Sequence, residues 1–115
     1  METESLDAGL DGGACPVTRL VDVIGGRWKV PILWQLSTGT HRYGALRRAI
    51  GGISERMLVQ QLRALEADGL VARTQYPEVP PRVEYALTER GCSLVPLLQG
   101  LAEWSATHLT AGAER

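Results

Sequence analysis

Residues 43–69 read YGALRRAIGGISERMLVQQLRALEADG, and this stretch decides the fold. Apolar side chains recur at helical spacing over 43–50, and Gly51-Gly52 then ends that segment. A second, longer helical pattern runs over 54–68, and Ser54 is placed to cap it. Two short helices joined by a glycine turn, the second longer and capped at its start, predict a helix-turn-helix.

A hairpin pattern follows the helix pair. Residues 70–76 and 82–87 are short runs rich in β-forming side chains, and the second run alternates apolar with polar or small residues. Between them lies PEVPP, residues 77–81, whose prolines prevent continued strand pairing at the tip. These runs predict a two-stranded hairpin with a stiff, exposed loop, and a helix-turn-helix followed by such a hairpin is typical of a winged helix.

Helical patterns also flank this central unit. Residues 16–24 repeat apolar side chains at helical spacing, begin with a proline and end before a glycine pair. Residues 27–36 are apolar nearly all round, which predicts a helix buried at the centre of the core. A last helix is expected from Thr88 onward, with a kink or a reset at Pro96, and residues 37–42 are expected to be a link. The expected fold class is therefore mainly α with a small β-hairpin wing, a winged helix-turn-helix.

Length and composition agree with one ordinary globular domain. The chain has 115 residues, of which 44% are hydrophobic. We expect residues 1–14 to form a disordered acidic arm, 15–108 the folded domain and 109–115 a flexible tail. The sequence holds no apolar run of about 18 residues and no signal-peptide pattern, so a cytoplasmic location and no membrane partner are expected.

Patterns for catalysis and metal binding are missing from the sequence. No Ser/His/Asp set and no phosphate-binding glycine loop occurs. Cys15, Cys92, His41 and His108 have no spacing typical of a zinc site, and a reducing cytosol argues against a disulfide. We therefore expect no catalytic residue, no metal and no cofactor, and we do not expect an enzyme.

Charge is segregated along the chain, although the net charge is only −1. Residues 1–14 hold four acids and no base, 83–115 hold four acids and two bases, and 15–82 hold ten bases and five acids. The middle stretch is therefore +5, and its surface could face the phosphates of DNA. The expected partner is a double-stranded DNA operator, which would place the protein on the nucleoid; a protein-interaction module is the alternative.

Six outward positions near the start of the helix expected at 54–68 could reach base edges in a major groove. Arg can form two hydrogen bonds with guanine, Gln two with adenine, and Glu can accept one from the cytosine amine. A solvated helix face is the alternative. The candidates for base contacts are Ser54, Glu55, Arg56, Val59, Gln60 and Arg63.

Seven basic side chains are candidates for contacts with the DNA backbone, where they would set register and affinity. Ordinary solubility is the alternative for each. Arg82, at the start of the second strand, could instead pair with Glu78 or Glu84 and hold the hairpin. The candidates for backbone contacts are Arg27, Lys29, Arg42, Arg47, Arg48, Arg73 and Arg82.

Apolar stripes on the first and last helices are wide for so small a domain, which favours a homodimer. The alternative is that the last stripe closes the core of a monomer. A dimer suits an operator built as an inverted repeat, with half-sites about one turn of DNA apart or a multiple of it. The candidates for dimerisation are Val17, Leu20, Val21, Leu94, Leu97, Leu98, Leu101 and Trp104.

Cys15 has the more reactive surroundings of the two thiols. It lies at the start of a helix and four residues before Arg19, and both features favour the thiolate. The alternative is a small buried hydrophobe, which is how a free cysteine usually behaves. Cys92 has no comparable surroundings.

Several blocks of sequence span nearly all of the part expected to be ordered. They include CPV at 15–17, DVIGGRWK at 22–29, RYGALRR at 42–48, DGLV at 68–71, VPPRVEY at 79–85 and Trp104. Together these blocks resemble the HxlR type of bacterial winged-helix regulators, which is related to MarR.

The resemblance implies a homodimer joined through its terminal helices, a recognition helix at 54–68, a wing at 70–87 and control of a nearby operon. Some relatives sense small electrophiles or oxidants through the cysteine that Cys15 matches. Two positions depart from the family pattern. Cys92 stands where relatives more often have a charged or polar residue, and Glu55 where a neutral or basic one is expected.

Overall fold

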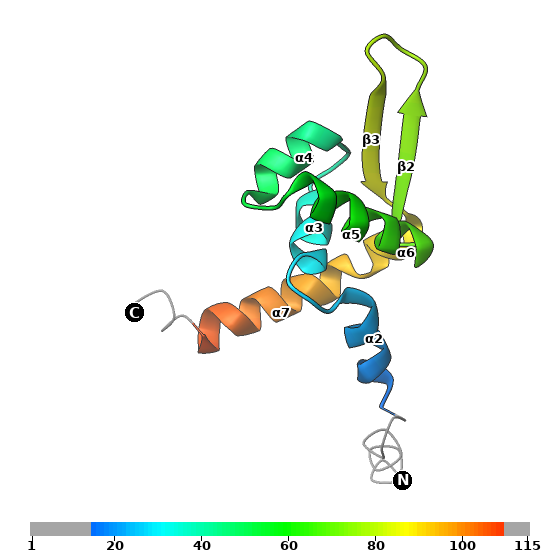
Figure 1. Ribbon diagram of the computed structural model, residues 1–115. Coiled ribbons are helices and arrows are strands. Elements are labelled where there is room, and N and C mark those ends of the chain that lie inside the picture. The colour runs from blue at the N-terminus through cyan, green and yellow to red at the C-terminus, as the bar shows by residue number, and fades with distance from the viewer. Residues whose placement is uncertain (1–14, 110–115) are drawn as a thin grey trace.

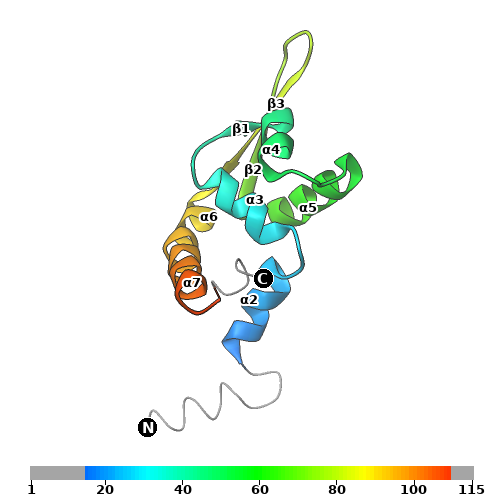
Figure 2. The ribbon, with the colours of Figure 1, turned by 90° about the vertical axis from the view of Figure 1, so that its left-hand side faces the viewer.

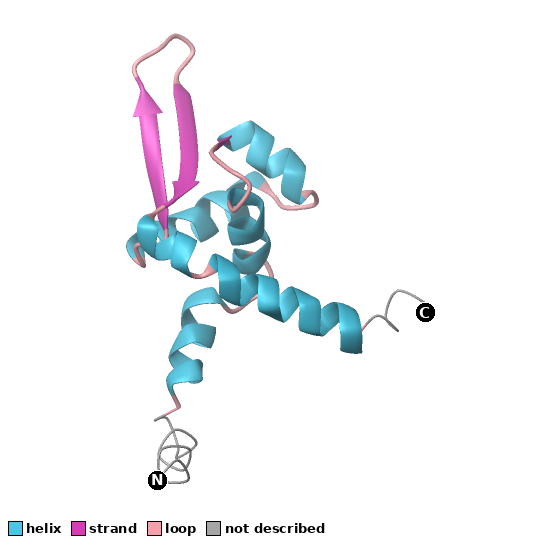
Figure 3. Cartoon of the chain, turned by 180° about the vertical axis from the view of Figure 1, so that it is seen from behind, coloured by secondary structure: helices cyan, strands magenta, loops and turns pink. Residues whose placement is uncertain are grey.

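A computed structural model describes residues 15–109 of the chain (Figure 1). Helices form most of it, and two of its strands form one projecting hairpin (Figure 3). In chain order the elements are α2 (Pro16–Ile24), α3 (Lys29–Leu36), β1 (His41–Arg42), α4 (Tyr43–Ile50), α5 (Glu55–Ala67), β2 (Val71–Tyr76), β3 (Arg82–Leu87), α6 (Glu89–Ser93) and α7 (Val95–His108). The expected winged helix-turn-helix fold is confirmed. The expected arm at 1–14 and nearly all of the expected tail lie outside the described residues.

Local chemistry sets the limits of α5. The Ser54 hydroxyl accepts a hydrogen bond from the Met57 backbone N–H at 3.1 Å, which satisfies a donor that the first turn of a helix leaves free. Leu58, Leu62 and Leu65 are buried on one face of the helix, as its spacing predicted. Gly69 follows the last turn with a φ of +76°, a conformation that glycine adopts without strain.

The turn between α4 and α5 depends on two glycines. Gly51 and Gly52 have φ values of +75° and +74°, which side chains other than glycine rarely adopt. Beyond the adjoining residues of the chain, no atom lies within 4 Å of a Cβ built at either residue. The backbone conformation, and not a lack of space, therefore requires glycine at both positions. The resulting turn connects α4 and α5, the two helices of the helix-turn-helix.

The sheet has three antiparallel strands in the order β1-β3-β2. The hairpin register runs from Val71 opposite Leu87 to Tyr76 opposite Arg82, as the two β-prone runs predicted. The interpretation of residues 37–42 as a link was wrong at its end, because β1 pairs with β3 there and sets His41 opposite Tyr85. A strand of two residues has no periodicity that a sequence pattern could reveal.

Helix α3 lies at the centre of the core, as predicted. Ile32, Leu33 and Leu36 are at most 2% exposed and pack within a cluster that includes the buried leucines of α5. The prediction that residues 27–36 are buried nearly all round was wrong at Trp34, which is 41% exposed. Pattern alone could not show this, because the neighbours of each side of the helix come from distant parts of the chain.

The C-terminal part divides into α6 and α7. The helix restarts at Leu94, and a proline, Pro96, stands in the first turn of α7, so the expected reset is confirmed. Thr88 caps α6: its hydroxyl accepts from the Gly91 backbone N–H at 3.0 Å and donates to the Gly69 carbonyl at 2.6 Å. One side chain thus joins α6 to the end of α5.

The two ends of the domain differ in character. Figures 1 and 2 show α4, α5 and the hairpin at one end, while α2 and α7 leave the body at the other. Between residues 15 and 109, no helix is long and apolar enough to cross a membrane.

Candidate nucleic-acid interface

The outward face of α5 carries the six residues predicted to contact bases. Five of them are exposed, Val59 is partly buried, and the helix is held in place by the buried leucines on its opposite face. The shallow depression along this face is lined by Glu55, Arg56, Val59, Gln60 and Arg63. The structure therefore brings five of the candidates together on one accessible surface; their contact with bases stays a prediction.

A groove with a volume of about 390 Å³ separates this helix from the hairpin. Arg42 contributes from β1, Arg73 from β2 and Val59 from α5. Arg63 and Arg73 also share a neighbouring depression with Glu66. Guanidinium groups from β1 and β2 thus lie beside the arginines of α5 itself, which gives the interface its positive charge.

Two more arginines lie at the turn of the motif. Arg47 and Arg48 line a depression at the turn together with Ser54 and Glu55. The Arg47 Nε atom donates to the Ile53 carbonyl at 3.1 Å, so this side chain also braces the turn. Both arginines remain exposed at the approach to the first turn of α5.

Tyr43 is a residue of this site that the sequence analysis missed. Its hydroxyl donates to the Glu55 carbonyl at 3.3 Å, which links α4 to the first turn of α5. Its ring lies 6.5 Å from that of Tyr85, in a tilted arrangement. Burial raises the pKa of Tyr43, and the nearby Glu55 carboxylate adds to that shift. The hydroxyl therefore stays protonated and able to donate at neutral pH.

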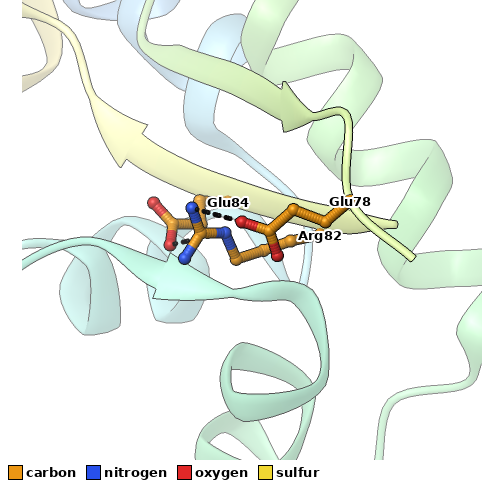
Figure 4. Close-up of polar contacts among 3 residues, drawn as sticks. All are labelled: Glu78, Arg82 and Glu84. Carbon is orange, nitrogen blue, oxygen red and sulfur yellow. Dashed lines mark ion pairs between the residues drawn. The ribbon is translucent and has the colours of Figure 1, made fainter. Parts of the chain in front are cut away.

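Arg82 makes ion pairs within the hairpin, as one of the two interpretations of this residue predicted (Figure 4). Its Nη2 atom lies 3.0 Å from a Glu78 carboxylate oxygen, and its Nε atom lies 3.8 Å from Glu84. The guanidinium also lies 3.9 Å from the centre of the Tyr76 ring. These contacts support the interpretation that Arg82 holds the hairpin, whereas a contact of Arg82 with the DNA backbone stays a prediction.

Arg27 and Lys29 do not join the other basic candidates. They lie before and at the start of α3, and neither lines the depressions around α5 that are described above. The Arg27 guanidinium lies 4.7 Å from the centre of the Trp28 ring, a cation–π contact. Their contact with the DNA backbone stays a prediction without support from this arrangement.

The residues predicted for dimerisation fall into two groups. Leu98 is only 4% exposed and belongs to the core, so assigning it to a dimer interface was wrong. Leu20 and Leu94 are partly buried against that core. Large exposed fractions, from 44% to 60%, are found at Val17, Val21, Leu97, Leu101 and Trp104.

Cys15 lies directly before α2 and is partly buried, whereas Cys92 is exposed on α6. The pKa of the Cys15 thiol is lowered, first by the backbone N–H of Val17 and then by that of Thr18. Neither N–H makes a capping hydrogen bond of normal geometry with the sulfur. The helix start thus favours the thiolate as predicted, but Arg19 is not among the groups that cause the shift.

Comparison with known proteins identifies relatives of this arrangement. The model of the HxlR-like helix-turn-helix family matches residues 23–113. An HTH-type transcriptional regulator of Methanothermobacter thermautotrophicus is 49% identical over 98 residues, which cover 85% of this chain and 75% of the relative.

Two solved structures are also similar. The redox regulator HypR, in its oxidized form, is 46% identical with a TM-score of 0.76, and the match covers 82% of this chain and 97% of HypR. The transcriptional regulator YodB from Bacillus subtilis, in its reduced form, is 33% identical with a TM-score of 0.72, covering 82% of this chain and 93% of YodB. The family and these relatives are transcriptional regulators and not enzymes.

Proposed function

The chain belongs to the HxlR-like helix-turn-helix family of transcriptional regulators, and from that premise we propose that it is a homodimer that binds a specific double-stranded DNA operator. The single observation that carries this proposal is the outward face of α5, where Arg56, Gln60 and Arg63 line one depression beside a groove with further arginines. Binding to chromosomal DNA would place the protein in the cytoplasm, on the nucleoid.

In the proposed complex, α5 enters the major groove. Arg56 forms paired hydrogen bonds with guanine, Gln60 does so with adenine, and Glu55 accepts from a cytosine amine. Arg47 and Arg48 at the turn of the motif contact phosphates, which fix the register but carry no base information.

The base of the wing, and not its tip, supplies the wing's charge to the DNA. Arg42 and Arg73 line the groove beside α5 and remain exposed. The tip carries Glu78, whose carboxylate is paired with Arg82. We therefore assign phosphate contacts to Arg42 and Arg73 and none to Arg82.

Dimerisation is proposed through α2 and α7. Val17 and Val21 lie one helical turn apart on α2, and Leu97, Leu101 and Trp104 recur at helical spacing on α7. Both helices extend away from the body of the domain (Figures 1 and 2). Exposed apolar residues so arranged mark an interaction surface, and a second copy would bury them and supply the second half-site of an inverted repeat.

A thiol response is proposed at Cys15. Its lowered pKa raises the share of nucleophilic thiolate at neutral pH, and the similar HypR is a redox regulator. A small electrophile or an oxidant would modify this thiol beside the proposed dimer helix α2 and change operator binding. If the Cys15→Ser variant still loses operator binding after treatment with diamide or a quinone, Cys15 is not the sensor.

Selection of bound sites from random duplex DNA, with the protein kept reduced, tests the proposed function. We expect enrichment of an inverted repeat, since each protomer presents one α5 to one half-site. No enrichment, together with no binding at low salt, would instead favour a protein-interaction module.

A further inference from the structure

A groove between α2 and α6 is separate from the proposed DNA interface. Its volume is about 270 Å³, and none of its lining residues belongs to the depressions around α5. Arg19 contributes from α2, and Arg90 from α6. Figure 1 shows both helices away from the hairpin tip and from α4.

The floor of this groove is apolar. Leu70, which links α5 to β2, is 3% exposed, and its neighbours Leu20, Val23 and Leu94 are partly buried against the core. Water on such a surface gains few hydrogen bonds, so an apolar ligand body that displaces it is favoured.

The mouth of the groove is cationic. Arg19 and Arg90 are both exposed, and the ion pairs found within residues 15–109 involve neither of them. No acidic residue lines the groove, although Asp22 and Glu89 lie on the same two helices. The Ser93 hydroxyl is occupied, since it donates to the Arg90 carbonyl at 2.6 Å. The groups left to bind a ligand are two guanidinium forks, which match the geometry of a carboxylate.

We propose that this groove binds a small organic carboxylate with an apolar body. The body covers Leu20, Leu70 and Leu94, and the carboxylate accepts hydrogen bonds from Arg19 and Arg90. The volume is slightly below the roughly 300–1,000 Å³ typical of clefts for drug-sized ligands, so the ligand is small, such as an aromatic acid of one or two rings.

The position of the groove makes this ligand an effector of the regulator, a consequence that rests on the proposed function. A ligand held by both arginines fixes α2 relative to α6. Helix α2 directly follows Cys15 and carries part of the proposed dimer surface, and it joins α3 through Gly25-Gly26, where Gly26 has a φ of +89°. Helix α6 is joined to the end of α5 by the hydrogen bond from Thr88 to Gly69. Occupancy would therefore change how two copies of α5 are presented to an operator.

The test is calorimetric titration of the full-length protein with benzoate and 2-naphthoate, each compared with its uncharged amide. We expect each acid to bind about tenfold more tightly than its amide, since hydrogen bonds to charged groups are the stronger kind. Arg19→Ala and Arg90→Ala should each weaken acid binding by about tenfold. Arg48→Ala is the matched control, because this exposed arginine lies at the turn of the motif, and it should bind like the wild type.

Equal binding of acid and amide, no binding of either acid, or acid binding that survives both substitutions would each overturn the proposal. Unchanged far-UV circular dichroism and retention of amide binding show that a variant is folded. The regulatory step is read separately: operator affinity should shift at least severalfold with saturating acid, and an unmoved affinity would refute that step. If the protein binds no DNA, the proposed function fails, but the titration still decides whether the groove takes a carboxylate.

Discussion

Substituting alanine for Gly91 should break the junction between α6 and the end of α5. A Cβ at this buried glycine would overlap the Leu70 carbonyl oxygen and lie 3.1 Å from its carbon and 3.2 Å from Leu87 Cδ2. The backbones must then separate by roughly 1 Å to restore ordinary contact. Overpacking of this kind costs about 1–3 kcal/mol, occasionally more.

The same movement strains two hydrogen bonds of Thr88. Its backbone N–H donates to the Leu70 carbonyl at 3.1 Å, and its hydroxyl donates to the Gly69 carbonyl at 2.6 Å. Each is worth about 1 kcal/mol, and the better helix propensity of alanine returns up to about 1 kcal/mol. We therefore expect Gly91→Ala to lower the free energy of unfolding by about 3 kcal/mol, a large part of the total for a small domain.

Urea unfolding followed by far-UV circular dichroism measures this loss, at one fixed protein concentration because dimerisation would link stability to concentration. Gly44→Ala is the matched control. A Cβ there meets only the far end of the Arg48 side chain, at 3.4 Å, so this variant should gain up to about 1 kcal/mol. A Gly91→Ala protein as stable as the wild type would refute the account of the junction, as would equal losses in both variants.

Three further predictions concern the cap, the thiol and the dimer. Ser54→Ala should cost about 1 kcal/mol in urea unfolding because the Met57 N–H loses its acceptor, and an unchanged midpoint would argue against the cap. In a Cys92→Ser variant, Cys15 should react with iodoacetamide at pH 7 faster than an unstructured cysteine peptide, since a pKa below its ordinary value increases the thiolate; equal rates would contradict the lowered pKa. Val21→Asp should yield monomers in sedimentation, whereas Val79→Asp, at a fully exposed wing residue, should leave the dimer intact; a monomeric wild type would refute dimerisation.

Elements with a strong local signal could be predicted from the sequence. Helix α5 has a capping serine, three leucines on one face and a closing glycine, and all of these act within a few residues of the helix. The hairpin could also be predicted from the sequence, because its two β-prone runs are separated by prolines. The outward face of α5 followed directly, since the buried face of an amphipathic helix determines the exposed one.

The remaining features depend on contacts between distant segments. Strand β1 forms because His41 meets Tyr85, which lies far along the chain. Leu98 was placed on a dimer surface because its spacing fits the apolar stripe of α7, but in the folded protein its side chain is buried in the core. Tyr43 was missed because its partner, the Glu55 carbonyl, is a backbone atom that no side-chain pattern could indicate. The sequence offered two possible carboxylate partners for Arg82, and only the folded hairpin shows its ion pair with Glu78 and its contact with the Tyr76 ring.

The most direct test of the central claim, that the outward face of α5 reads DNA sequence, is the affinity of Arg56→Ala for the selected operator and for its single-base variants. The account predicts that this variant loses roughly 1–3 kcal/mol on the operator and no longer discriminates at one base pair. Arg48→Ala, a phosphate contact in this account, should weaken binding to all sequences alike and reduce the salt slope by about one. If Arg56→Ala also weakened binding to every sequence equally, α5 would hold the DNA backbone and the claim would be contradicted.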